Sequence, residues 1–417
     1  MYNKHSLRQL TALRGKRVLV RVDYNVPFKR EAVANAPFTN ERGSITDLTR
    51  IQETLPTLQL LLEQGAKVIL ASHLGRPKGQ VVDEFSMDLV TDALQSLLPK
   101  VRVQKASAVV GETVEAEVAA LYEGDILVLE NVRFEAGEES NCPELSKALA
   151  RLCDVYVNDA FGAVHRAHAS TEGVAHQAHI AVAGLLMERE ITALGGVLSN
   201  PKRPFTALIG GAKVSSKIAV LTNLLDKVDN LIIGGAMVYT FLLAQGYSVG
   251  KSLVEPDFVE TAKGVMAKAE ANGVKLYISQ DLIVANEWNA NSPHQTVPAT
   301  AIPDGWEGMD IGPLTRGVLS DVLKASGSIL WNGPVGVFEW DNFANGTRTL
   351  AEAVKEATAN GTQSVLGGGD TLASIERFNM PKASFTHVST GGGASLEFIE
   401  GKALPGIVAL NDATVSV

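Results

Sequence analysis

The apolar positions in the first half of the chain form short runs that alternate with amphipathic stretches. The runs predict strands over residues 17–23, 67–72, 125–130 and 155–158, and the amphipathic stretches predict helices over 48–63, 86–98 and 143–152. Strands and helices that alternate at this spacing indicate βαβ units and a parallel sheet. Ligands of such sheets bind beyond the carboxyl ends of the strands, so the residues that follow each strand are the first candidates for function.

The second half of the chain repeats this pattern. Residues 183–198 have a helical period that ends at the proline-flanked segment 200–204, which predicts a connecting helix and a domain boundary. At 417 residues the chain is too long for one ordinary core, so two domains are expected. Further strands are predicted over residues 205–209, 230–233, 274–279, 328–331, 364–366 and 386–389, with helices after the first, the second and the fifth.

Composition narrows the function classes. Apolar residues make up 46% of the chain and charged residues 20%, which is typical of a globular protein in water. The formal net charge of -9 argues against a nucleic-acid partner. No apolar run is long enough to span a membrane and no signal pattern begins the chain, while two cysteines give no disulfide framework. A reduced, cytoplasmic setting is therefore expected.

Cationic side chains follow the predicted strands of the first half. Arginine suits bidentate recognition of phosphate and carboxylate groups. Any one of these arginines alone is more simply a solvated surface charge, but strand ends meet at one edge of a parallel sheet. The first strand ends in Asp23, Tyr24 and Asn25 at the same edge. The convergence of four arginines and a histidine there predicts a pocket for a small, highly anionic substrate, formed by Arg50, His73, Arg76, Arg133 and Arg166.

Glycines follow the predicted strands of the second half, where the backbone could approach a flat or phosphorylated ligand closely. The segments are 210–213, 234–235, 332–336, 367–371 and 391–393. Lys213 and Lys217 are predicted to begin one helix and to reach the same ligand from one face. Asp370 follows three glycines, so it could ligate a magnesium ion carried by phosphates, or it could simply cap the helix that begins there.

Three other motifs lead elsewhere. Residues 246–252 resemble a P-loop, but the glycines are one residue too close and the segment follows a helix instead of a strand. Two HxxH pairs, His165/His168 and His176/His179, lack the cysteine or carboxylate partners of a zinc site. No GxGxxG follows the first strand of either half, which disfavours a dehydrogenase.

Six segments together resemble the signature segments of the phosphoglycerate kinase family. They are RVDYNVP at 21–27, HLGRP at 73–77, HRAHAS at 165–170, GGAKVSSK at 210–217, WNGPVGVFE at 331–339 and GGGDT at 367–371. The resemblance runs in order over nearly the whole chain. It implies reversible phosphoryl transfer between 1,3-bisphosphoglycerate and ADP. The implied fold is α/β, with two Rossmann-like domains, each a mainly parallel sheet with helices on both faces, joined by a connecting helix.

The resemblance also implies which domain binds which ligand and what single residues do. Residues 1–181 would bind the phosphoglycerate, 182–199 would connect, 200–404 would bind the nucleotide, and the tail 405–417 would pack back on the first domain. Arg50 and Lys213 would act on the phosphoryl group in transit, and Asp370 would hold Mg²⁺ bound to ADP or ATP. The implied protein is a cytoplasmic monomer. The implied phosphoglycerate site is Asp23, Tyr24, Asn25, Arg50, His73, Leu74, Gly75, Arg76, Arg133 and Arg166, and the implied nucleotide site is Gly211, Ala212, Lys217, Gly235, Asn332, Pro334, Glu339, Gly367, Gly368, Gly369, Asp370 and Thr371.

Two departures from the family pattern are visible. Position 216 is serine where many members have aspartate, and residues 28–44 form a loop roughly a dozen residues longer than the family's usual hairpin. Two rival functions stay open on the sequence. One is another ATP-dependent ligase or acid kinase on a similar frame, and the other is a non-catalytic anion-binding protein, which the intact Lys213, Asp370 and Arg50 disfavour.

Overall fold

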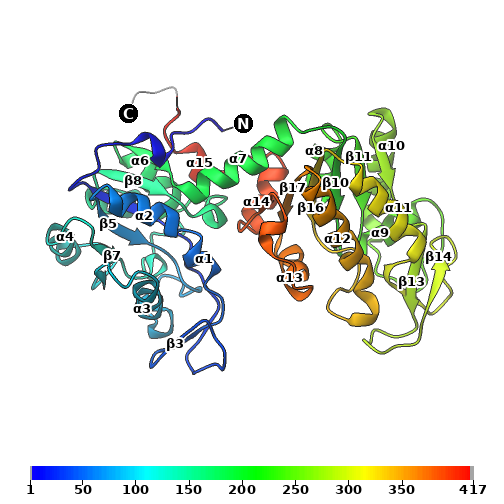
Figure 1. Cartoon of the computed structure of the whole chain (residues 1–417), viewed down its shortest axis with the longest axis horizontal. Helices are drawn as coiled ribbons and strands as arrows, with labels where there is room; N and C mark the ends of the chain where they lie inside the picture. The colour runs from blue at the N-terminus through cyan, green and yellow to red at the C-terminus, as the bar shows by residue number, and fades with distance from the viewer. Residues whose placement is uncertain (1, 414–417) are drawn as a thin grey trace. The chain divides into compact units, whose positions relative to one another are not determined.

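The structure, a computed structural model, describes residues 2–413 of the chain. Two compact units divide it: unit 1 holds the residues up to Thr192 together with those from Ala403 onward, and unit 2 is Ala193–Lys402. Each unit contains a six-stranded sheet flanked by helices (Figure 1). All strand pairs within these two sheets are parallel, as the alternating pattern of strands and helices predicts.

The sheet of unit 1 has the order β6-β7-β5-β1-β8-β9. Val18 on β1 lies between Val68 and Val155 of the neighbouring strands, and all three side chains are buried in the core of the unit. β6 and β9 were not among the predicted strands; each is three residues long, too short for a clear pattern. The strands are β1 (Arg17–Arg21), β5 (Lys67–Ala71), β6 (Val103–Lys105), β7 (Ile126–Val128), β8 (Val155–Asn158) and β9 (Ala181–Ala183).

The helix predicted over residues 48–63 is in fact two helices. Pro56 lies in the first turn of the second one, where its missing N–H breaks the hydrogen-bond ladder from the first. Thr54, between the two, donates from its hydroxyl to the Ile51 carbonyl. The helices of the part of unit 1 before the boundary region are α1 (Thr49–Gln52), α2 (Leu55–Glu63), α3 (Asp88–Leu97), α4 (Glu112–Ala119), α5 (Pro143–Arg151) and α6 (Val174–Gln177).

The long loop after the first strand is ordered. It folds into a three-stranded antiparallel sheet of β2 (Phe28–Lys29), β3 (Phe38–Asn40) and β4 (Gly43–Ile45), in the order β2-β4-β3. The buried Ser44 hydroxyl accepts from the Val33 N–H and donates to the Glu31 carbonyl, which fixes the turn between β2 and β3. Arg42 forms ion pairs with two aspartates of α3, so this extra sheet is attached to the body of unit 1.

The C-terminal segment belongs to unit 1. After α15 (Pro405–Val408), Asn411 extends the edge of the sheet: its N–H donates to the Ala181 carbonyl at 2.8 Å and its Oδ1 accepts from the Ala181 N–H at 2.7 Å. Lys4 forms an ion pair with Asp412 at 2.8 Å. Residues near the two ends of the chain therefore contact one another within unit 1, and the first and last coloured segments both belong to this unit in Figure 1. Residues 414–417 of the predicted tail lie outside the described residues.

The sheet of unit 2 has the order β12-β11-β10-β16-β17-β18. The chain runs outward from β10 in one direction and then returns to start again at β16, so a topological switch point lies between these two strands, where α/β sheets bind ligands. The strands are β10 (Phe205–Ile209), β11 (Asn230–Ile233), β12 (Lys275–Tyr277), β16 (Ser328–Asn332), β17 (Gln363–Gly367) and β18 (His387–Val388).

Unit 2 carries a second sheet that the apolar pattern did not predict. β13 (Asp281–Ala285) pairs with β14 (His294–Pro298) and β15 (Glu307–Ile311), all antiparallel. α7 (Leu185–Ser199) crosses the boundary between the units without interruption at Gly195–Gly196. The other helices are α8 (Ile218–Leu224), α9 (Met237–Ala244), α10 (Val259–Ala271), α11 (Pro313–Lys324), α12 (Asn345–Ala359), α13 (Gly369–Arg377) and α14 (Gly393–Ile399).

Candidate functional site

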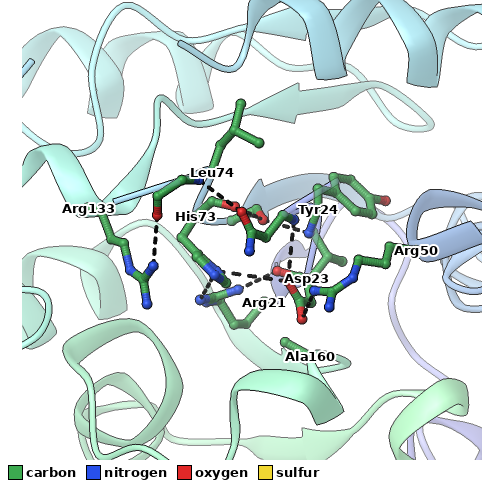
Figure 2. Close-up of polar contacts among 12 residues, drawn as sticks. Arg21, Asp23, Tyr24, Arg50, His73, Leu74, Arg133 and Ala160 are labelled. Atoms are coloured by element: carbon green, nitrogen blue, oxygen red, sulfur yellow. Dashed lines mark hydrogen bonds and ion pairs between the residues drawn. The ribbon is translucent and has the colours of Figure 1, made fainter. Parts of the chain in front are cut away.

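In unit 1, the strand-end residues gather around one carboxylate. Asp23, just beyond β1, forms an ion pair with Arg50 at the start of α1, and its Oδ1 lies 3.9 Å from Nδ1 of His73 beyond β5 (Figure 2). Burial would raise the pKa of the Asp23 carboxyl, but the positive charges around it, those of Arg50 and Arg21 among them, hold this pKa below its usual value. Asp23 is therefore ionised at neutral pH, and it holds Arg50 next to His73.

The loop after β5 is fixed by amide side chains. Asn131 accepts from the Leu74 N–H at 3.2 Å and donates to the Leu74 carbonyl at 2.7 Å. Asn25 accepts from the Gly75 N–H at 2.9 Å, and Arg133 donates to the Gly75 carbonyl at 2.8 Å. Gly75 has a φ of 63°, and a Cβ there would lie 2.4 Å from the Phe85 ring. The backbone path from 73 to 76 thus requires glycine and leaves Arg76 exposed.

Not every predicted residue presents its side chain here. Tyr24 and Leu74 are 0% and 1% exposed, and the Tyr24 hydroxyl pairs with Thr54 below the surface. Arg133 is buried, whereas Arg76 and Arg166 are exposed. Within residues 2–413 neither Arg76 nor Arg166 forms an ion pair. Two of the arginines predicted for an anionic ligand are therefore not compensated by a carboxylate within the described residues.

Unit 2 opens a crevice at the switch point between β10 and β16. A Cβ at Gly210 would lie 2.0 Å from the Pro334 carbonyl oxygen, and one at Gly235 would lie 2.5 Å from the Gly211 carbonyl oxygen. Only glycine lets these strand-end loops approach one another so closely. The crevice holds two adjoining cavities that share Gly211, Ala212 and Asp370.

The first cavity has a volume of about 460 Å³ and is mainly apolar. Pro334 and Val337 line it on one side and Gly235 on another, with exposed Glu339 at its rim. Trp288 and Trp340, whose ring centroids are 5.0 Å apart, extend the wall. Apolar walls with a carboxylate at the rim suit a flat base and the hydroxyls of its ribose.

The second cavity, about 380 Å³, is lined by amide groups and cations. Lys217 Nζ donates to Asn332 Oδ1 at 2.7 Å, and Asn332 Nδ2 donates to the Gly367 carbonyl at 2.9 Å. Gly367 itself is buried behind the lining. Thr371 closes the loop by accepting from the Gly333 N–H at 2.7 Å. The remaining predicted residues that line this cavity are Lys213, Gly368 and Gly369.

The start of α13 points into both cavities. Gly368, with a φ of 95°, is its N-cap, and no side chain caps this helix. The alternative in which Asp370 caps the helix is therefore wrong, because Asp370 lies inside the first turn with its carboxylate exposed. Free N–H groups at a helix N-terminus favour a phosphate, and an exposed carboxylate beside them is available to a cation.

One helix prediction in unit 2 is also wrong. α8 begins at Ile218, so Lys213 and Lys217 are not one turn apart on a helix. The intervening segment is a loop that Ser215 fixes by donating to Glu255 at 2.6 Å. Ser216, the departure from the family pattern, donates to the Lys213 carbonyl at 2.9 Å. Both lysines still line the second cavity, from a loop held by local hydrogen bonds.

Sequence reasoning missed the residues beneath the unit 1 site. Arg21 was read only as part of a strand, yet its side chain is buried against His73 and Ser170. Asn131 and Glu138 were given no role, although both hold strand-end loops in place. A charged residue inside an apolar strand was the one available signal, because a buried arginine requires partners.

One α/β unit has uncompensated arginines at its strand ends. The other has a glycine-lined crevice with lysines and a helix N-terminus. This combination is typical of a kinase that acts on a small anionic substrate. The family model described as "PGK: Phosphoglycerate kinase" matches residues 7–402. The chain belongs to the phosphoglycerate kinase family, and it catalyses the glycolytic phosphoryl transfer between 1,3-bisphosphoglycerate and ADP.

Two solved structures are similar over almost their whole length. The phosphoglycerate kinase of Coxiella burnetii is 42% identical, with a TM-score of 0.86, and the match covers 97% of this chain and 98% of that one. The phosphoglycerate kinase of Pyrococcus horikoshii OT3 is 30% identical, with a TM-score of 0.79 and the same coverage. Among residues 2–413, no helix has the length and apolar character that crossing a membrane requires.

Proposed function

We propose that residues 1–181 with the tail 405–417 form the phosphoglycerate-binding domain, that 182–199 connect, and that 200–404 form the nucleotide-binding domain. The observation that carries this proposal is the different chemistry of the two sets of strand ends. The side chains proposed to bind phosphoglycerate are Asp23, Asn25, Arg50, His73, Arg76, Arg133 and Arg166, and those proposed to line the nucleotide site are Gly211, Ala212, Lys217, Gly235, Asn332, Pro334, Glu339, Gly368, Gly369, Asp370 and Thr371.

The phosphoglycerate site is proposed because its cations outnumber its anions. Arg50 is compensated by Asp23, whereas the exposed Arg76 and Arg166 form no ion pair within the described residues 2–413. Arg133 is held between the Gly75 carbonyl and Glu139, so its guanidinium is fixed in place. Fixed and free arginines together suit a ligand with a phosphate at one end and a carboxyl group at the other.

The nucleotide is proposed to lie along the two adjoining cavities of unit 2. Its base would occupy the apolar cavity, Glu339 would accept from the ribose hydroxyls, and the phosphates would reach Lys217 and the N-terminus of α13. Burial lowers the pKa of Lys217, and Asp370 and Glu400 oppose that shift. A phosphate beside Lys217 would further favour its charged form.

The nucleotide site has a carboxylate that could bind magnesium. The carboxylate of Asp370 is exposed at the junction of the two cavities, and within residues 2–413 it forms no ion pair. Mg²⁺ is commonly held by one or two carboxylates together with substrate phosphates. Asp370 is therefore proposed to hold the ion, which would offset phosphate charge when bound.

Transfer itself is proposed to depend on positioning and charge. Arg50 and Lys213 would stabilise the charge on the transferring phosphoryl group. No protein nucleophile is required, because the acceptor is the terminal phosphate of ADP in one direction and the carboxylate of 3-phosphoglycerate in the other. Since the two ligands are proposed to bind different domains, the domains must come together for direct transfer, which also excludes water from the acyl phosphate.

Binding measurements on variants of each proposed site test the assignment. The double variant Arg76→Ala/Arg166→Ala is expected to weaken 3-phosphoglycerate binding at least about tenfold in calorimetry and to leave MgATP binding unchanged. Lys217→Met is expected to weaken MgATP binding and to leave 3-phosphoglycerate binding unchanged. Arg8→Ala is the control, because Arg8 is an exposed arginine of unit 1 paired with Glu188. Loss of both affinities in either variant would overturn the division of the two ligands.

The protein is proposed to be a monomer, as its resemblance to the phosphoglycerate kinase family implies. Light scattering coupled to gel filtration is expected to give the mass of one 44.3 kDa chain. A mass twice the expected value would contradict the monomer.

A cytoplasmic setting is proposed because both cysteines are free.

A further inference from the structure

A buried network lies directly beneath the proposed phosphoglycerate site. Arg21, which is 1% exposed, donates from Nε to the Ser170 hydroxyl at 2.8 Å. That hydroxyl donates in turn to Glu138 Oε1 at 2.5 Å, and the Ser170 N–H donates to Glu138 Oε2 at 2.9 Å. A fully buried carboxylate therefore compensates the charge of Arg21 through one hydroxyl group and holds the guanidinium in one orientation.

The same guanidinium faces the imidazole of His73. Nη2 of Arg21 lies 3.2 Å from Nδ1 of His73, and the two side chains are side by side in Figure 2. An arginine offers only N–H donors, so in this contact Nδ1 must be the acceptor and carries no proton. A doubly protonated imidazole would place N–H against N–H and positive charge against positive charge.

Asp23 is the other group near Nδ1, and it would favour the opposite arrangement. Its Oδ1 lies 3.9 Å from Nδ1, beyond hydrogen-bond distance, and its Oδ2 is taken by Arg50. The Arg21 contact therefore determines the protonation of His73. The single proton of a neutral imidazole must then be on Nε2, which has no partner within residues 2–413.

We propose that Arg21 is a positioning residue that fixes His73 as the neutral tautomer with its proton on Nε2, so that His73 binds the substrate as a hydrogen-bond donor and not as a cation. This inference rests on the proposed function, which assigns His73 to the phosphoglycerate site. The matching acceptor is an anionic oxygen of the substrate, from its carboxyl or its phosphate group. The charge that holds the substrate then comes from arginines alone.

The electrostatic surroundings of His73 agree with this arrangement. Burial is the largest influence and lowers the pKa of His73 well below its usual value. Asp23 opposes that shift, and Arg21, Arg133 and Arg50, from three different elements, reinforce it. A permanent cation at His73 would add to this repulsion, whereas a neutral donor adds none.

Nitrogen-15 NMR of histidine-labelled wild-type protein reads the tautomer directly. The expected spectrum at pH 7 has an unprotonated Nδ1 and a protonated Nε2 for His73, assigned by the loss of its signals in His73→Gln. A protonated Nδ1, or an imidazolium, would overturn the proposal. Because this measurement is made on the wild-type protein, it does not depend on whether any variant folds.

Arg21→Met tests the positioning role in the same experiment. With the donor removed, the Nδ1 signal of His73 is expected to shift toward the protonated form and the pKa of His73 to rise. If Arg21→Met is folded and retains the wild-type tautomer, Arg21 does not set it. Ser170→Ala, which loosens Arg21 without removing it, is expected to give an intermediate spectrum.

Two substitutions of His73 separate this inference from the proposed function. Glutamine can donate from its amide and is uncharged, so His73→Gln is expected to keep 3-phosphoglycerate affinity within about threefold, whereas His73→Phe loses about tenfold or more. Equal losses in both variants would show that a donor does not suffice. If His73→Phe binds 3-phosphoglycerate as tightly as the wild type, His73 is outside the site and the assignment in the proposed function fails, whatever the tautomer.

Discussion

Arg50 donates from Nη1 to Oδ2 of Asp23, so the residue proposed to act on the transferring phosphoryl group is held by a carboxylate from the neighbouring strand end. Removing this guanidinium is expected to lower kcat by up to roughly 10³-fold, by analogy with the arginine fingers that stabilise the transferring phosphoryl group in GTPases. The KM for 3-phosphoglycerate is expected to change little, because Arg76, Arg133 and Arg166 remain.

Steady-state kinetics of Arg50→Ala in both reaction directions measure this split. Asp23→Asn is the companion variant, since it keeps Arg50 but frees it from its ion pair, and a smaller loss of kcat is expected. An unchanged kcat with a raised KM in Arg50→Ala would reduce Arg50 to a binding residue.

Tyr24 was predicted to be in the phosphoglycerate site, but its side chain does not face the ligand. Its side chain is fully buried and its hydroxyl pairs with Thr54 at 2.8 Å, below the ligand-facing surface. Tyr24→Phe is therefore expected to cost about 1 kcal/mol of unfolding free energy through the lost hydrogen bond and to leave both KM values unchanged. Denaturant unfolding and kinetics on the same preparation check this, and a raised KM for 3-phosphoglycerate alone would return Tyr24 to the site.

Asp370→Asn tests the magnesium assignment. The amide has nearly the same shape as the carboxylate but lacks its charge, and no capping hydrogen bond is lost because Gly368 is the N-cap. Calorimetry is expected to show weaker binding of MgATP, with 3-phosphoglycerate binding and thermal stability unchanged. Wild-type affinity for MgATP and wild-type turnover in the variant would exclude Asp370 as a ligand of the ion.

Asp310 is expected to make the stability of the protein depend on pH. It is buried against Gly336 in the wall of the first cavity of unit 2, and it accepts hydrogen bonds from the N–H groups of Gly346 and Ile311. Burial raises the pKa of Asp310 from 3.8 to about 7, and these hydrogen bonds only partly oppose the shift. The folded state therefore binds this proton more strongly than the unfolded state does.

The sign of the effect follows from linkage. The stabilising contribution of Asp310 is fully present below the pKa that its carboxyl has in the unfolded state, about 4. This contribution is lost as the pH rises through the higher pKa that the carboxyl has in the folded state. Asp310→Asn cannot ionise, so the difference in unfolding free energy between wild type and variant is expected to shift against the wild type as pH rises from 4 to 7. Parallel pH curves for the two proteins would show that Asp310 does not titrate in this range.

The sequence predicted the parts of the site that depend on strand ends. Arg76, Arg133 and the glycine segments lie where the βαβ pattern indicates, because a parallel sheet brings its carboxyl strand ends to one edge. The helix predicted to begin at Lys213 was wrong. Residues 213–217 form a loop, because Ser215 donates to Glu255, which lies 40 positions further along the chain. The role of Arg21 could not be seen, because its partners Ser170 and Glu138 come from distant parts of the chain.

Closure is expected to require both ligands. Each ligand alone supplies only part of the contacts that favour a closed form, so its differential affinity for that form is smaller. Small-angle scattering on the free protein, the two singly bound forms and the doubly bound form is expected to give the smallest radius of gyration for the last. The same radius in all four states of an active preparation would contradict closure.

The joining of the two chain ends in unit 1 has a consequence for synthesis on the ribosome. Asn411 completes the sheet edge at Ala181, and Asp412 pairs with Lys4, so unit 1 needs residues from both ends of the chain. Unit 2 is one continuous segment, Ala193–Lys402, and all of it is made before the last part of unit 1. Unit 1 therefore cannot complete this sheet edge until the whole of unit 2 has been made, and a truncation before Asn411 is expected to destabilise the unit whose other residues are translated first.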